Sequence, residues 1–171
     1  MKSNKLTIVL FVIYLIVLVW ILLFKLGVQF SYMEERRFSL IPFSALFATH
    51  RRLNLSEIIS NVIIFIPLGV YAGVLFKRWA FGKKLFSVFF ISLLIEAFQF
   101  IFRIGAFDIT DIIANTLGGL FGLLLFIGIE KLFSNSAKAQ KFINIIGNIG
   151  TVLIISFLVL LKLNMLPIRY Q

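Results

Sequence analysis

The sequence predicts an all-α membrane protein, a polytopic bundle of about five transmembrane helices. Three observations lead to this prediction. First, 61% of the 171 residues are hydrophobic and the mean hydropathy is +1.06, and a soluble chain of this length could not bury so much apolar surface. Second, the apolar residues form five runs, each close to the roughly 20 residues that a helix needs to cross the hydrocarbon core. Third, most charged residues lie between those runs.

The first predicted helix covers residues 6–24. Lys2 and Lys5 precede it, and Lys25 follows it. The run is longer than the apolar part of a cleaved signal peptide, and it lacks a small-x-small cleavage site. We therefore expect it to remain as a membrane span, with Trp20 near its far interface.

Residues 25–57 form a segment that mixes charged and apolar side chains. This composition is typical of a segment that lies on the membrane interface. The segment holds two arginine pairs, whose guanidinium groups could bind the phosphate of a lipid-linked ligand. More often such pairs extend from the apolar boundary to the headgroups without binding a ligand. The candidate phosphate-binding residues are Arg36, Arg37, Arg51 and Arg52.

Four more helices are expected after this segment. A loop over residues 77–84 carries four cations and no acid, and residues 130–141 form a second polar loop. No internal repeat is visible, so we expect residues 1–171 to form one domain. The remaining predicted helices cover about 58–76, 85–102, 108–129 and 142–163.

Small residues predict where two of these helices pack closely. Ala114, Gly118 and Gly122 recur every four residues, so they share one face of their helix. Such a face lets a neighbouring backbone approach, and it can also serve dimerisation. Pro67 and Gly69 are placed to kink the predicted helix over residues 58–76 and to shape its packing.

Eight polar side chains are expected to gather toward one end of three helices. Their spacing of three or four residues places them on one face of each helix. Ionisable groups at membrane depth are costly and usually mark a functional site. The amides among them can instead hold helices together by hydrogen bonds. The predicted group comprises Glu57, Asn61, Glu96, Gln99, Arg103, Asp108, Asp111 and Asn115.

Composition excludes several classes of function. The chain has no cysteine and a single histidine, His50, so disulfides, thiolate metal sites and His-rich metal sites are excluded and a Ser-His-Asp triad is disfavoured. We predict no metal site and no cofactor. The formal charge of +10 reflects cations placed between apolar runs. That placement indicates membrane topology and anionic headgroups, not nucleic acid.

The loop over residues 77–84 is the densest in cations. Short loops of this kind stay on the cytoplasmic side of a membrane. We therefore expect a cytoplasmic amino terminus and an extracellular carboxyl terminus in the cell membrane. In this orientation the eight polar residues form a funnel that opens to the outer face.

The chain resembles the VanZ family over most of its length. The resemblance rests on the order and spacing of several segments. Many family members carry an arginine nearer to the first aspartate than Arg103, and the sequence leaves open whether Arg103 takes its place. The matching segments are NVIIFIPLG at 61–69, EAFQ at 96–99, FDITDIIANTLGG at 107–119, WILLFKL at 20–26 and RFSLIPF at 37–43.

The resemblance implies an integral membrane protein that lowers susceptibility to teicoplanin and related lipoglycopeptides without remodelling cell-wall precursors. The expected partners are membrane lipids, with a lipid-linked peptidoglycan precursor or a lipoglycopeptide as a further ligand. The sequence gives no oligomeric state. The alternative is an intramembrane enzyme that modifies a lipid-linked precursor, with Glu96, Asp108 and Asp111 as acid and base groups or as Mg²⁺ ligands. A small transporter or a scaffold is a third reading, and the lack of a repeat disfavours transport.

Overall fold

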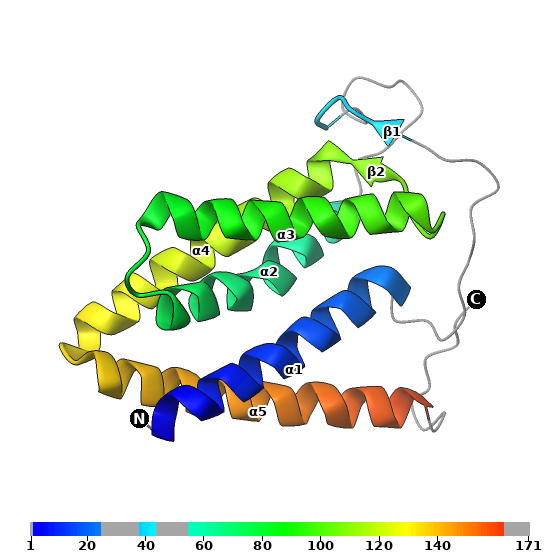
Figure 1. The fold of residues 1–171 in the computed structure, drawn as a ribbon. Helices are drawn as coiled ribbons and strands as arrows, with labels where there is room; N and C mark the ends of the chain where they lie inside the picture. The colour runs from blue at the N-terminus through cyan, green and yellow to red at the C-terminus, as the bar shows by residue number, and fades with distance from the viewer. Residues whose placement is uncertain (1, 25–37, 44–54, 163–171) are drawn as a thin grey trace.

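The computed structural model describes residues 2–24, 38–43 and 55–162 (Figure 1). These residues contain five helices, each with a stretch long and apolar enough to cross a membrane. The predicted all-α membrane bundle is confirmed, and the chain is a multi-pass membrane protein. The helices are α1 (Lys2–Phe24), α2 (Leu55–Leu75), α3 (Phe81–Ile101), α4 (Ile109–Phe133) and α5 (Ser136–Lys162).

The helices alternate in direction, with α1, α3 and α5 running one way and α2 and α4 the other (Figure 1). At one end of the bundle, β1 (Phe38–Ser39) pairs in parallel with β2 (Phe107–Asp108). We call this the strand end. The opposite end holds the short turns from α2 to α3 and from α4 to α5, and we call it the turn end.

Helices α2 and α4 form the most closely packed pair in the bundle. A Cβ atom added at Gly69, Gly118 or Gly122 would lie within 2.2 Å of a backbone carbonyl oxygen of the other helix. Ala114 on the same face of α4 is only 1% exposed. The small-residue face therefore brings the backbone of α4 against that of α2. Pro67 lies inside α2, which continues to Leu75.

Helix α1 covers the α2–α3 side of this pair through an apolar core. Leu18 from α1, Phe65 from α2 and Val88 from α3 are each no more than 1% exposed and belong to one buried cluster. The Tyr14 hydroxyl adds a hydrogen bond of 2.8 Å to the backbone carbonyl of Ile64. This polar contact fixes α1 against α2.

The prediction of a polar loop over residues 130–141 is wrong, because most of these residues are helical. Helix α4 ends at Phe133, and the next residue, Ser134, caps it in the left-handed conformation with φ of 47°. Asn135 then caps α5, since its side-chain oxygen accepts hydrogen bonds from the backbone N–H groups of Ala137 and Lys138. A two-residue turn thus replaces the expected loop.

The other helices also extend beyond the runs that hydropathy marks. Helix α2 begins at Leu55 instead of residue 58, and α3 begins at Phe81 instead of residue 85. Hydropathy detects the part of a helix that lies in hydrocarbon. The backbone hydrogen bonds that define the helix continue into the polar headgroup region.

The predicted interfacial segment over residues 25–57 is described only at 38–43 and from residue 55 onward. Strand β1 and the following turn expose Leu40 and Ile41. The backbone N–H of Phe43 donates a 3.0 Å hydrogen bond to the Thr110 hydroxyl, which ties this segment to the start of α4. The candidate phosphate-binding arginines lie outside the described residues: Arg36, Arg37, Arg51 and Arg52.

Candidate functional site: a polar cluster at the strand end

Polar side chains from α2, α3 and α4 meet between these helices near the strand end. The Asn61 amide of α2 donates a 2.8 Å hydrogen bond to the Asp111 carboxylate of α4. The Asn115 amide of α4 donates a 3.0 Å hydrogen bond to the Ser92 hydroxyl of α3. Both contacts link neighbouring helices. We call the following residues the polar cluster: Asn61, Ser92, Glu96, Asp108, Asp111 and Asn115.

The carboxylate of Glu96 is buried at the junction between β2 and α4. Glu96 is 3% exposed, and its Oε2 atom accepts a 3.3 Å hydrogen bond from the backbone N–H of Asp108. The Asp108 side chain in turn caps α4, accepting a 2.7 Å hydrogen bond from the N–H of Thr110. Asp108 therefore precedes α4 as its N-cap residue. This corrects the prediction that the helix begins at residue 108. The negative charge of Asp108 also interacts favourably with the positive N-terminal end of the α4 dipole.

The cluster becomes more buried with depth. Asp108 and Asp111 are partly exposed, whereas Glu96 and Asn115 are almost fully buried. Asn115 follows Asp111 by one helical turn, about 6 Å along the axis of α4. The polar cluster therefore extends from partly exposed carboxylates at the strand end to buried side chains inside the bundle.

The side-chain oxygen of Asn115 lies in the buried part of the polar cluster. Asn115 is 1% exposed, and among the described residues no hydrogen-bond donor reaches its Oδ1 atom. A buried carbonyl without a donor costs about 1–3 kcal/mol. Such a group is commonly satisfied by an ordered water or by a bound donor. The buried part of the cluster therefore has an acceptor that a hydroxyl, amide or ammonium group could satisfy.

Two members of the predicted group lie near the cluster but point elsewhere or stay at the surface. The Gln99 amide donates a 2.9 Å hydrogen bond to the backbone carbonyl of Leu22, so it joins α3 to the end of α1. Glu57 is exposed in the first turn of α2, one turn before Asn61.

Arg103 does not share the face of Glu96 and Gln99, which corrects the expected spacing. Helix α3 ends at Ile101, and Arg103 adopts the left-handed conformation with φ of 58°. The N–H groups of the next two residues fold back onto the Gln99 carbonyl, a typical helix ending. Arg103 is exposed, and within the described part of the chain it forms no ion pair with Asp108.

Ser92 and Thr110 contribute hydrogen bonds at this site but were not among the residues predicted from the sequence. Ser92 is fully buried and lies one turn before Glu96, so its place on the same helical face was a usable signal. Thr110 follows Asp108 by two residues, the spacing of a capping turn. Short hydroxyl side chains are easily overlooked in an apolar run, because they change its hydropathy little.

A second buried polar group joins α1 to α5 near the turn end. The Thr7 hydroxyl donates a 2.9 Å hydrogen bond to the side-chain carbonyl of Asn144, and Gln140 donates to Thr7 at the same distance. All three side chains are at most 7% exposed. This group satisfies its members by mutual hydrogen bonds and holds two helices together.

The carboxylates of the polar cluster do not form a metal site in the described residues. No group of three or more histidine, cysteine, aspartate or glutamate side chains there is arranged to hold a metal ion. The structure thus gives no support to the metal-dependent form of the enzyme alternative.

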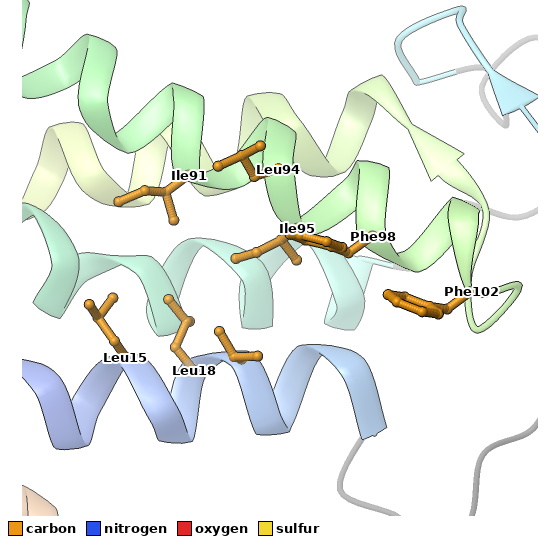
Figure 2. A pocket seen from close by; sticks show the side chains of 8 residues that line it. Leu15, Leu18, Ile91, Leu94, Ile95, Phe98 and Phe102 are labelled. Carbon is orange, nitrogen blue, oxygen red and sulfur yellow. The ribbon is translucent and has the colours of Figure 1, made fainter.

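An apolar groove of about 410 Å³ lies between α1 and α3 (Figure 2). Leu15 and Leu18 of α1 face Ile91, Ile95 and other apolar residues of α3 across it. On α3 the groove reaches the last turn of the helix (Figure 2). The turns of α3 that line this groove also carry Ser92 and Glu96 on another face. Helix α3 therefore contributes both to the polar cluster and to the apolar groove.

Comparisons with known proteins place this architecture in a family. The VanZ/LLP1 family model matches residues 11–134, which include every member of the polar cluster. The chain is 40% identical over 156 residues to Protein VanZ of Enterococcus faecium, covering 89% of this chain and 92% of that protein. No solved structure matches the chain. The protein thus belongs to the VanZ/LLP1 family.

Proposed function

We propose that this VanZ-family membrane protein lowers susceptibility to teicoplanin-type lipoglycopeptides by acting at the outer leaflet, without remodelling cell-wall precursors. Its ligand is a lipid-anchored molecule, either the drug or the lipid-linked peptidoglycan precursor that the drug seeks. Binding at the membrane surface reduces the access of the drug to its target. The family membership carries the link to resistance, and the polar cluster carries the proposed site.

The position of the polar cluster supports action at a membrane surface. Its carboxylates lie at the strand end of the spanning helices, and its deeper members Glu96 and Asn115 are buried inside the bundle. A ligand held there would lie at headgroup depth with its polar groups on Asp111 and Asn115. Polar groups gathered near one end of the bundle suit surface binding better than transport across the membrane.

The apolar groove between α1 and α3 supports a preference for acylated ligands. Its lining offers no polar atom to water, so a hydrocarbon chain is the chemistry that it accommodates best. Vancomycin, which lacks an acyl chain, could contact the polar cluster but would not fill the groove. We therefore expect the protein to protect against teicoplanin more than against vancomycin.

The orientation of the chain is part of this proposal, with the strand end extracellular and the amino terminus cytoplasmic. Because the sequence contains no cysteine, a single introduced thiol can report the side of each end. An impermeant maleimide added to intact cells should label Ala106→Cys at the strand end and leave Ser134→Cys at the turn end unlabelled. The reverse pattern would contradict outer-leaflet action.

The test of function is expression of this chain alone in a susceptible Gram-positive host. The minimum inhibitory concentration of teicoplanin should rise, and that of vancomycin should change less. Asp111→Asn keeps an oxygen that can accept from Asn61 but removes the negative charge. It should return teicoplanin susceptibility to that of cells with an empty vector, at unchanged membrane abundance.

Glu130→Gln is the matched control, because it makes the same chemical change at an exposed position of the turn end. This variant should protect as well as the unmodified chain. Equal protection by the unmodified chain against teicoplanin and vancomycin would contradict the proposal. So would a lack of protection against either drug. A change in lipid or precursor mass that Asp111→Asn abolishes would favour the enzyme alternative instead.

A further inference from the structure

The turn end carries a second cavity, far from the polar cluster. It has a volume of about 380 Å³ and lies between the end of α2, the turn to α3 and the start of α5. Its polar and charged lining comes from Lys77, Arg78, Trp79 and Gln140. We call this cavity the basic pocket.

An aromatic platform holds the pocket at the membrane boundary. The Trp79 ring stacks on Phe76 with ring centroids 4.4 Å apart. The Lys83 ammonium sits 4.6 Å above the Trp79 ring, a cation–π contact that keeps this charge over the pocket rim. Tryptophan at the end of an apolar span is typical of the headgroup level. We therefore expect the pocket to open at the level of the bilayer phosphates.

The charge around the pocket is strongly one-sided. Among the residues whose side chains the structure describes, eight lysines and arginines lie at the turn end against one acid, Glu130. The cations are Lys5, Lys77, Arg78, Lys83, Lys84, Lys131, Lys138 and Lys141.

The two cations that line the pocket differ in how they are held. Lys77 bonds to the Ser136 hydroxyl and lies 4.0 Å from a Glu130 oxygen, so its ammonium already has partners from α5 and α4. Arg78 is exposed and has no hydrogen-bond or ion-pair partner within the described part of the chain. Its guanidinium presents a planar donor pair of the kind that binds phosphate oxygens bidentately.

We infer that the basic pocket binds the phosphodiester headgroup of an anionic phospholipid. Arg78 supplies the main hydrogen bonds to phosphate oxygens, and Lys77 supplies a positioned charge beside it. Trp79 packs against the glycerol region at the boundary of the apolar span. The surplus of cations favours a lipid with net negative charge over a zwitterionic one, whose headgroup carries its own cation. This site is separate from the proposed resistance site.

The experiment uses the full chain, purified in detergent and observed by native mass spectrometry. Phosphatidylglycerol and phosphatidylcholine with identical acyl chains are added in turn. Phosphatidylglycerol should remain bound in preference to phosphatidylcholine. In Arg78→Gln its apparent affinity should fall roughly fivefold, the loss expected for one basic side chain at an anionic membrane surface. The double variant Lys77→Gln with Arg78→Gln should lose more.

Lys138→Gln is the matched control, because Lys138 is an exposed cation of the turn end that does not line the pocket. It should retain nearly all of the phosphatidylglycerol binding. Equal retention of the two lipids would overturn the inference, and so would an equal loss in Arg78→Gln and Lys138→Gln, which would indicate diffuse charge alone. Inorganic phosphate should not displace the lipid at equal concentration, and displacement would show a site for the free anion. None of these readouts depends on drug resistance.

Discussion

The inner helices α2, α3 and α4 differ from the outer pair α1 and α5 in how they are held together. In an apolar 18-residue window of α2 and of α4, 44% of the residues are buried, against 17% in the corresponding windows of α1 and α5. Glycines bring the α2 and α4 backbones into direct contact, whereas α1 and α5 join through the hydrogen bonds of Thr7. The family match at residues 11–134 includes the inner helices but not Thr7 or its partners.

This difference shows where the bundle can support a site. Close backbone packing leaves few alternative positions for a side chain, so the polar cluster is held in a fixed arrangement. The outer pair is held by side chains that can rearrange with less effect on the rest. We therefore expect changes in the inner helices to affect both folding and function, and changes at the Thr7 contact between α1 and α5 to affect stability alone.

The largest effect should come from Gly122→Ala in α4. A Cβ atom there would lie 2.0 Å from the backbone carbonyl oxygen of Ile66, so α2 and α4 must separate. Overpacking of this kind costs about 1–3 kcal/mol or more. Thermal unfolding of the purified protein in detergent should show a clear loss of stability, and teicoplanin protection should fall with it.

Gly128→Ala on the same helix provides the control for this prediction. Nothing lies within 4 Å of the position that its Cβ would take, and alanine favours a helix over glycine by up to about 1 kcal/mol. Its stability should equal or exceed that of the parent. A similar loss in both glycine variants would refute the close-packing explanation.

A smaller effect is expected from Thr7→Val in the outer pair. Valine keeps the shape but removes the hydroxyl that bonds Asn144 and Gln140. Leaving buried polar groups short of a partner costs about 1–3 kcal/mol. Unfolding measurements should show this loss, while protection per unit of membrane protein should stay unchanged.

Thr151→Val is the comparison for Thr7→Val, since the Thr151 hydroxyl bonds within its own helix, to the carbonyl of Gly147. It should be close to neutral. A fall in protection per molecule for Thr7→Val would mean that the contact between α1 and α5 contributes to function as well as to stability.

The smallest and most specific effect should come from two substitutions at Asp108. Asparagine caps a helix about as well as aspartate, whereas alanine does not. Asp108→Ala should therefore destabilise the protein by about 1 kcal/mol, and Asp108→Asn should be nearly as stable as the parent. Both should lose protection if the negative charge of Asp108 acts on the ligand.

Normal protection by Asp108→Asn would assign Asp108 to capping alone. In that case Glu96 and Asp111 would remain as the acidic groups of the site. Membrane abundance, measured for each variant by immunoblot, separates loss of folding from loss of function.

The sequence determined the fold class and most of the residues of the candidate site. Whether a helix crosses a membrane depends on the hydropathy of about 20 consecutive residues, which is a local property. The spacing of Asn61, Glu96, Asp111 and Asn115 along their helices likewise follows from the helical repeat. For these features no long-range information was needed.

Only the tertiary structure decided which polar groups meet. The glycine contact between α2 and α4 sets the rotation of these two helices, which brings Asn61 to Asp111. On α3, Gln99 instead bonds to the end of α1. The left-handed residue at 103 removed an arginine from the predicted face. Partner choice depends on the rotation and separation of helices distant in sequence. Helix periodicity determines which face of a helix carries a side chain, but it does not determine which neighbouring helix packs against that face.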